Sequence, residues 1–250
     1  GFLVGHEMGL GKSAVSIISA DIMNLPRLLI LPASLKKQWE GEIKKWSINK
    51  DVNVVEKGND RLVEGWNLVS YDYFVRHYEK FDLSNFLIII DEASYIKNYK
   101  AKRTKIVQEK CKEAKFRIAL TGTPVSNHLY NYYNILSYIK PNFMSIKYFN
   151  RNFIVFDEIV ARGGKLIKVP AGMKNLDKFI EIIKPYYDRK RKEDVAKFLP
   201  EKIVQWRFIN NTSEKLSIKS ELIRQATSFF EVFALLRVLD CDDIINQSSG

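Results

Sequence analysis

A glycine-rich stretch near the start of the chain constrains the fold more than any other feature. It reads Gly5-His6-Glu7-Met8-Gly9-Leu10-Gly11-Lys12-Ser13, and it lies between an apolar run (Phe2 to Val4) and a helical pattern (Ala14 to Met23). Glycines let successive backbone N–H groups turn toward an anion, and the helix that follows presents the positive end of its dipole. The stretch therefore predicts a phosphate-binding loop.

In such a loop Gly9 and Gly11 shape the backbone, Lys12 reaches the terminal phosphates and Ser13 completes the shell of a Mg²⁺ ion. His6 stands where the strict pattern has glycine, with a glycine one place earlier. The alternative interpretation is an ordinary glycine-rich turn before a helix. A second, independent motif is needed to choose between them.

Short apolar runs alternate with helical patterns along the first half of the chain. Leu35 to Trp46 has apolar residues at positions 35, 39, 43 and 46 with lysines between them, which predicts an amphipathic helix with a basic outer face. This alternation favours an α/β fold, in which a parallel sheet is covered by helices and ligands gather at the carboxyl ends of the strands. The expected strands are Leu28 to Leu31, Val52 to Val55, Leu68 to Ser70, Leu87 to Ile90 and Arg117 to Leu120.

Polar residues directly follow two of these strands: Asp91-Glu92 after Ile90, and Thr121-Gly122-Thr123-Pro124 after Leu120. An acid at a strand end can hold Mg²⁺ through a water, and an adjacent acid can orient and deprotonate the attacking water. We assign the first role to Asp91 and the second to Glu92. An isolated Asp-Glu pair is more often a solvated helix start, but its place after four aliphatic residues favours the catalytic interpretation.

Five motifs in order resemble the first motor lobe of the Swi/Snf family of superfamily-two helicases. They are Glu7 to Ser13, Leu31 to Leu35 with Gln38-Trp39, Val69 to Tyr71, Asp91 to Ala93 with Lys97-Asn98, and Leu120 to Pro124. Arg189 to Val195, with Leu199-Pro200 and Lys202, is similar to the family's arginine-lysine and leucine-proline signature. The resemblance covers roughly residues 2 to 205.

The resemblance implies a DNA-dependent ATPase, a helicase-like remodeller or repair motor that translocates on double-stranded DNA by hydrolysing ATP between two recombinase-like lobes. It implies ATP and Mg²⁺ as cofactors, and Thr121 and Thr123 as residues that couple the nucleotide state to DNA. It also implies a set of residues that face the DNA backbone: Pro32, Ser34, Ser70 and Tyr71.

Three departures from the family pattern stand out. His6 replaces the usual acid, Ser94 replaces the usual histidine after the acidic pair, and Val125-Ser126-Asn127 replaces a leucine-glutamine-asparagine run. The change at Ser94 bears on the coupling of hydrolysis to DNA more than on nucleotide binding.

The net charge of +11 favours a polyanionic partner, although a basic chain also fits plain solubility. Nine basic residues lie between Lys97 and Arg117 against two acids, which makes this the best local basic segment. We expect Lys97, Lys100, Lys102 and Arg103 to contact DNA phosphates. The alternative, with equal weight, is a solvated helix face.

We expect three regions: a recombinase-like, P-loop NTPase lobe over residues 1–130, a helical insertion with the basic signature over 131–200, and a strand and helices over 201–250. The aromatic residues between Tyr130 and Phe156 should pack a small core within the insertion, with stacking on bases as the alternative, and Gly163-Gly164 should form a turn. The last region should lead toward a second lobe that completes the ATP site. Without it, we expect slow ATP turnover.

Cysteine and histidine usage predicts neither a disulfide framework nor a zinc site, because the two cysteines lie far apart and the three histidines do not cluster. This fits a reducing intracellular compartment, whether cytoplasm, nucleoid or nucleus. No apolar run approaches the roughly 18 residues that a membrane span requires. The early phosphate loop suggests a piece of a longer chain.

Two rival functions remain from the sequence. One is a nucleic-acid-binding or interaction module whose ATPase has decayed, which the departures at His6 and Ser94 would support. The other is a different phosphate-loop enzyme, such as a small-molecule kinase, which leaves the motifs at Pro32 to Trp39 and Thr121 to Pro124 unexplained.

Overall fold

Parallel strands form the centre of the structure. The computed structural model describes residues 1–59, 61–122, 129–160 and 164–195, which belong to one unit, residues 1–198. Within these ranges seven strands form one sheet in the order β3-β4-β2-β5-β6-β1-β9, and every neighbouring pair is parallel. The strands are β1 (Phe2–Val4), β2 (Arg27–Leu31), β3 (Val52–Val55), β4 (Trp66–Ser70), β5 (Leu87–Ile90), β6 (Phe116–Leu120) and β9 (Tyr187–Asp188).

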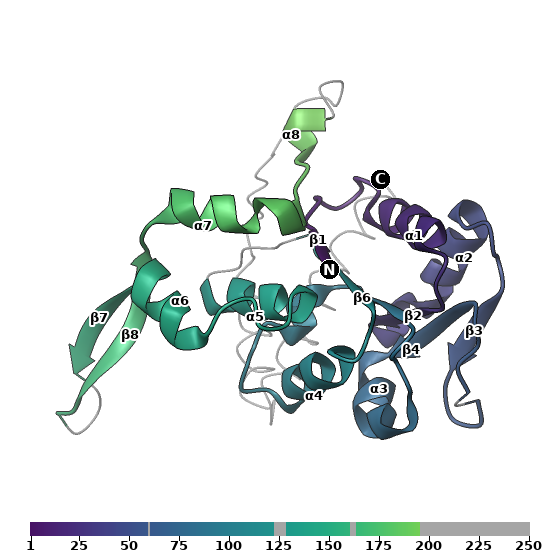
Figure 1. Cartoon of the computed structure of the whole chain (residues 1–250), viewed down its shortest axis with the longest axis horizontal. Coiled ribbons are helices and arrows are strands. Elements are labelled where there is room, and N and C mark those ends of the chain that lie inside the picture. The colour runs from purple at the N-terminus through teal and green to yellow at the C-terminus, as the bar shows by residue number, and fades with distance from the viewer. Residues whose placement is uncertain (60, 123–128, 161–163, 196–250) are drawn as a thin grey trace, which may run out of the picture. The chain divides into compact units, whose positions relative to one another are not determined.

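Helices cover both faces of this sheet (Figure 1). Helices α1 (Lys12–Met23) and α2 (Lys36–Trp46) pack on one face, and α3 (Tyr71–His77), α4 (Lys102–Cys111) and α5 (Leu129–Ile139) pack on the other. The remaining α-helices are α6 (Ile146–Phe153), α7 (Leu176–Ile183) and α8 (Lys192–Val195), and short 3₁₀ turns are η1 (Ala33–Leu35), η2 (Tyr78–Lys80), η3 (Ala93–Ile96) and η4 (Lys184–Tyr186). None of the helices in the described ranges has the length and apolarity that crossing a membrane requires.

The central strands are apolar on both sides because each side faces a helical layer. In β2, Leu28 and Ile30 belong to the core under α3, α4 and α5, whereas Leu29 and Leu31 belong to the core under α1 and α2. All four side chains are fully buried. Continuous aliphatic runs are what a parallel sheet covered on both faces requires, so the predicted α/β fold class is confirmed.

The prediction of a helical insertion over residues 131–200 is wrong for part of that range. Strands β7 (Ile154–Val160) and β8 (Leu166–Met173) form a two-stranded antiparallel sheet, which Figure 1 shows beyond α6 and α7. Gly164, with φ of 75°, stands just before β8, at the position of the expected turn. Nor does the aromatic cluster form a separate core, since Phe149 and Phe179 belong to the same buried cluster as Leu28. The division at residue 130 stays a prediction.

The strand β9 was not predicted at all. Tyr187 and Asp188 pair with Leu3 and Val4 of β1, so that the chain returns to the main sheet after the insertion. This return brings the basic stretch that begins at Arg189 beside the phosphate loop. The strand and helices predicted over residues 201–250 lie outside the described residues.

Candidate nucleotide site

The predicted phosphate loop connects the carboxyl end of β1 to α1. Gly9 and Gly11 have φ of 84° and 74°, in the left-handed region that residues with a Cβ rarely adopt. Gly11 is the residue before α1, which begins at Lys12. The first N–H groups of a helix have no partner within the helix, so the loop ends in a site suited to an anion.

The Lys12 side chain turns back over this loop. Its Nζ donates to the carbonyl oxygens of His6 at 3.0 Å and Glu7 at 3.2 Å. Carbonyl oxygens are weaker partners for an ammonium group than phosphate oxygens. The geometry therefore fits a lysine that would exchange these bonds for the phosphates of a bound nucleotide. Ser13 follows it in the first turn of α1 and is partly exposed.

Asp91 and Glu92 follow β5 at the same edge of the sheet. Asp91 is buried, with Oδ2 accepting from the Trp39 indole N–H at 2.7 Å and Oδ1 accepting from the Glu92 backbone N–H at 2.9 Å. Glu92 is half-buried, and its φ of 48° is a left-handed conformation that a residue other than glycine adopts at an energetic cost. Such backbone strain clusters at functional sites.

The charges of these residues act on one another. Burial raises the pKa of Asp91, although the Trp39 and Glu92 hydrogen bonds and the Lys12 charge oppose the shift. Burial and the Asp91 charge raise the pKa of Glu92, again opposed by Lys12. Burial lowers the pKa of Lys12, while Glu92 and Asp91 act to raise it. The sheet thus places Lys12, Asp91 and Glu92 close enough for the charge of each to affect the pKa of another.

Thr121 and Gly122, which follow β6, lie at the same edge of the sheet. The Thr121 backbone N–H donates to the Val4 carbonyl at 3.1 Å, and the Thr121 residue is fully buried. A Cβ placed on Gly122 would lie 3.3 Å from Met8 Cγ and 3.6 Å from Lys12 Nζ, so this glycine backs directly onto the loop. Thr123, predicted with Thr121 to couple nucleotide and DNA, lies outside the described residues.

The end of β9 and the stretch that follows it also contact the loop. The Gly5 N–H donates to the Asp188 carbonyl, the Glu7 N–H to the Lys190 carbonyl, and the Lys192 N–H to the Glu7 carboxylate. His6 is buried, with Nε2 2.7 Å from Asp188 Oδ2 and Nδ1 3.3 Å from the Leu10 carbonyl oxygen. The histidine that replaces the family's usual acid therefore has its own acidic partner, on the adjacent strand.

The residues predicted to face DNA fall into two groups. Pro32 is partly exposed and Ser34 is exposed, both just beyond the carboxyl end of β2. Ser70 is buried and accepts the Tyr73 N–H as the cap of α3. Tyr71 is 1% exposed, and its hydroxyl donates to the Asp91 carbonyl at 2.8 Å. Because a side chain buried in this way has no surface to offer a DNA backbone, the prediction for Tyr71 is wrong.

The basic segment divides between the two edges of the sheet. Lys97, Lys100 and Lys102 are exposed and follow β5 on the side of Asp91. Arg103 pairs with Asp72 at 2.8 Å, and its Cζ lies 5.2 Å from the centroid of the Tyr95 ring, so it stacks against α3 and η3. The end of α4, just before β6, lies at the amino-terminal edge. Only the first part of the segment therefore lies near the predicted site.

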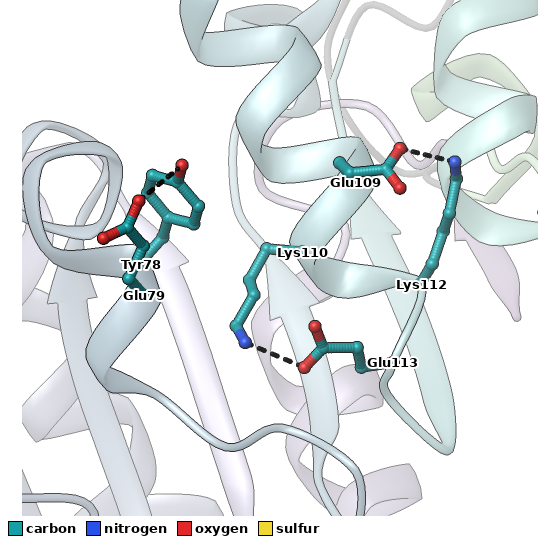
Figure 2. Close-up of a pocket in the computed structure, with 6 residues that line it drawn as sticks. All are labelled: Tyr78, Glu79, Glu109, Lys110, Lys112 and Glu113. Carbon is teal, nitrogen blue, oxygen red and sulfur yellow. Dashed lines mark hydrogen bonds and ion pairs between the residues drawn. The ribbon is translucent and has the colours of Figure 1, made fainter.

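A surface hollow of about 530 Å³ lies at that amino-terminal edge and is unrelated to the phosphate loop. Its charges are paired within it, as Figure 2 shows: Lys110 with Glu113 at 2.8 Å and Lys112 with Glu109 at 2.6 Å. Tyr78, the aromatic residue of its lining, donates to Glu79. The paired charges leave little to attract a phosphate, so this hollow is not the candidate site.

The donor set fits Mg²⁺ bound together with a nucleotide. No group of three or more His, Cys, Asp or Glu side chains in the described part of the chain could hold a metal ion. Mg²⁺ is commonly bound by one or two protein oxygens together with phosphates and waters. The Ser13 hydroxyl and the Asp91 carboxylate match that pattern, and phosphate oxygens would complete it.

Sequence reasoning assigned no role to two residues that the structure connects to the site. Trp39 donates to Asp91, and Asp188 faces His6. The Gln38-Trp39 pair was a visible signal, because a tryptophan on an apolar helix face needs an acceptor when it is buried. Asp188 carried no such signal, since its partner His6 lies 182 positions away in the sequence.

Known proteins resemble this chain over most of its length. The sequence matches the SNF2-related domain family over residues 1–233. It is 33% identical over 147 residues to the SWI/SNF-related matrix-associated actin-dependent regulator of chromatin subfamily A-like protein 1 of Bos taurus, covering 56% of this chain and 16% of that protein. It is 26% identical over 248 residues to the DNA repair and recombination protein RAD54B of Gallus gallus, covering 89% of this chain and 26% of that protein.

A solved structure agrees with these matches. The Sulfolobus solfataricus SWI2/SNF2 ATPase core, in complex with double-stranded DNA, superimposes with a TM-score of 0.63 at 26% identity. The match covers 96% of this chain and 53% of that one, so the chain spans about half of that ATPase core. It spans at most about a quarter of the two curated relatives. The chain belongs to the SNF2-related domain family, the group that its motifs resemble.

Proposed function

We propose that this chain is the ATP-binding lobe of a DNA-dependent ATPase that translocates on double-stranded DNA. The observation that carries the proposal is the convergence of Lys12, Asp91 and Glu92 at the carboxyl-terminal edge of one parallel sheet. Relatives named as a chromatin regulator and a DNA repair protein support it. So does the similarity to an ATPase core solved with double-stranded DNA.

Each residue has a distinct proposed role. The loop from Gly5 to Lys12 binds the phosphates, with the Lys12 ammonium replacing its present carbonyl partners by phosphate oxygens. Ser13 and Asp91 hold Mg²⁺, which when bound would neutralise charge on the phosphate oxygens. Glu92 orients the attacking water and accepts its proton, a task for which a raised carboxyl pKa is suited.

The proposed DNA surface is the exposed part of the same edge. Lys97, Lys100, Lys102 and Ser34 are exposed there. A translocase must step along any sequence, so its contacts should fall on phosphates and carry little base information. DNA binding separates this proposal from a small-molecule phosphate-loop enzyme. ATP binding separates it from a module with a decayed ATPase.

Duplex DNA binding at this edge is the test. We expect weak binding to unrelated duplexes, with a dissociation constant on the order of 10⁻⁴ to 10⁻⁶ M near physiological salt, because a single lobe touches few phosphates. Replacing Lys97, Lys100 and Lys102 together by Glu should weaken binding to every sequence. It should also lower the log-log salt slope by about 0.9 for each DNA phosphate that the variant no longer neutralises. Fluorescence anisotropy over a range of salt concentrations measures both quantities.

The matched control reverses the same number of charges at the other edge. Lys44, Lys45 and Lys50 are exposed and lie at the end of α2 and before β3. Their replacement by Glu should leave the salt slope nearly unchanged. Equal losses in the two triple variants would mean that binding follows the net charge of +11 alone and would contradict the proposed surface.

A further inference from the structure

The tryptophan on α2 connects the apolar core to the proposed metal ligand. Trp39 is 2% exposed and lies in the layer between the sheet and helices α1 and α2. A buried indole N–H needs an acceptor, and burying it without one costs free energy. Its acceptor here is Oδ2 of Asp91, at 2.7 Å. A neutral acceptor could also satisfy the indole N–H, so the use of this carboxylate has a consequence for Asp91.

Asp91 is held from several directions at once. Its backbone N–H donates to the Ile30 carbonyl and its backbone oxygen accepts from Tyr71, which fixes the main chain. Oδ1 accepts from the Glu92 N–H at 2.9 Å. Of these three bonds, the one to Oδ1 restrains only one oxygen of the carboxylate. The Trp39 bond restrains Oδ2, so the two bonds together set the plane of the group.

A carboxylate held in this way can still act as a ligand. Each carboxylate oxygen has two lone pairs, so one bond from the indole leaves Oδ2 able to accept another. Partners of this kind orient metal ligands, and their loss typically weakens metal binding by about 10- to 100-fold. Trp39 has the distance, burial and acceptor that this role requires.

We propose that Trp39 is a positioning residue, which orients the Asp91 carboxylate for the Mg²⁺ that accompanies the nucleotide. The inference rests on the proposed nucleotide site. It adds a residue that never touches the nucleotide and that acts only through Asp91. Its effect should therefore appear in the Mg²⁺ dependence of binding and be absent from binding without metal.

The test compares ATP affinity in excess Mg²⁺ with ATP affinity in EDTA, by titration calorimetry. Trp39→Phe keeps a buried aromatic ring and removes the N–H donor. We expect the ratio of the two affinities to fall about tenfold relative to the wild type, the lower end of the range for such partners. The affinity in EDTA should stay within about twofold of the wild type, because Trp39 acts only through the metal ligand.

Trp66→Phe is the matched control. Trp66 is fully buried in the same apolar layer, and its indole N–H donates to the Ser47 hydroxyl at 2.9 Å, away from the site. Both variants lose an indole donor and some packing, so both should melt at lower temperature. Only Trp39→Phe should lose the Mg²⁺ enhancement. An unchanged ratio in Trp39→Phe, or an equal fall in both variants, would overturn the inference.

A measurement on the unsubstituted chain covers the case in which Trp39→Phe does not fold. The indole N–H resonance of Trp39, assigned by replacing the other tryptophans one at a time, should shift when Mg²⁺ is added to the ATP-bound chain. The Trp66 resonance should not shift. A Trp39 resonance that stays in place would contradict the inference. If the wild type binds ATP equally in Mg²⁺ and in EDTA, the proposed nucleotide site itself fails.

Discussion

At Glu92 the backbone and the side chain are both held in unfavourable states. The φ of 48° is uncommon for a residue with a Cβ, and burial beside Asp91 disfavours the charged carboxylate. Stability alone would select glycine or asparagine here. Burial and a neighbouring negative charge are the means by which the pKa of a catalytic base is raised, which supports the role proposed for Glu92.

The raised pKa of Glu92 makes a prediction about stability and pH. The folded chain holds this proton more tightly than the unfolded chain. The free energy of unfolding of the wild type therefore falls as the pH rises from the pKa of Glu92 in the unfolded chain through its higher pKa in the folded chain. Since Gln cannot ionise, Glu92→Gln should melt at a higher temperature than the wild type at neutral pH. The gain should shrink as the pH falls through the raised pKa and vanish below the ordinary glutamate range.

Thermal melts from about pH 3 to about pH 8 span this range and measure the difference in melting temperature between Glu92→Gln and the wild type. Glu181, exposed on α7, provides the control, because Glu181→Gln should melt at nearly the same temperature as the wild type at every pH. A Glu92→Gln variant less stable than the wild type at neutral pH would show that the ionised side chain is favoured in the fold.

Sequence reasoning assigned roles to Lys12, Asp91 and Glu92 but not to the contacting residues Trp39 and Asp188. The spacing of the glycines and Lys12, and the position of Asp91 at a strand end, are local signals. The bond from Trp39 to Asp91 joins α2 to the end of β5, and the contact of His6 with Asp188 joins the loop to β9. Such pairs depend on how distant segments pack, which a single sequence does not encode as a pattern.

At the scale of elements, one buried acid ties α1, β2 and the end of α2 together. Asp21 pairs with Arg27 at 3.1 Å, and both side chains are at most 7% exposed. It also accepts from the Ser47 hydroxyl and from the Ile48 backbone N–H, the latter at 2.7 Å. The phosphate-loop helix is thus fixed to the sheet at its far end by hydrogen bonds as well as by apolar packing.

Removing this acid should destabilise the fold strongly. Asp21→Ala leaves the Arg27 charge buried without its partner, a change that typically costs about 3–5 kcal/mol. Urea unfolding should report a loss of that size. The control is Glu181→Ala on the exposed face of α7, where surface substitutions usually change stability by less than about 0.5 kcal/mol. A loss below about 1 kcal/mol for Asp21→Ala would mean that solvent replaces the ion pair.

The elements that could be predicted are those whose patterns are local. The runs at Val52–Val55 and Leu87–Ile90 became strands with the predicted bounds. Leu87–Ile90 is aliphatic throughout and buried, as a sheet covered on both faces requires. The segment Ile154–Val160, with two β-branched residues at each end, was a readable strand signal, but the family resemblance favoured helix there. The two-residue strand β9 has too short a pattern to recognise, and it exists because of its pairing with β1.

At the scale of the whole molecule, the two edges of the sheet have different chemistry. The carboxyl-terminal edge carries the glycine loop, the two acids and exposed lysines. The amino-terminal edge also has exposed lysines, at Lys44, Lys45 and Lys50, but Lys110 and Lys112 there are paired with acids. A parallel sheet places every βα turn on one side, so a chain of this topology has one edge on which to build a nucleotide site.

Titration calorimetry with Mg·ATP tests the central claim most directly. We expect saturable binding by the wild type. In Lys12→Ala, a charge-assisted bond to phosphate worth about 1.5–3 kcal/mol is removed, which should weaken the affinity by at least about tenfold. Lys178→Ala, at an exposed position on α7, should bind like the wild type. Equal affinity in wild type and Lys12→Ala, or no binding by the wild type, would contradict the proposed nucleotide site.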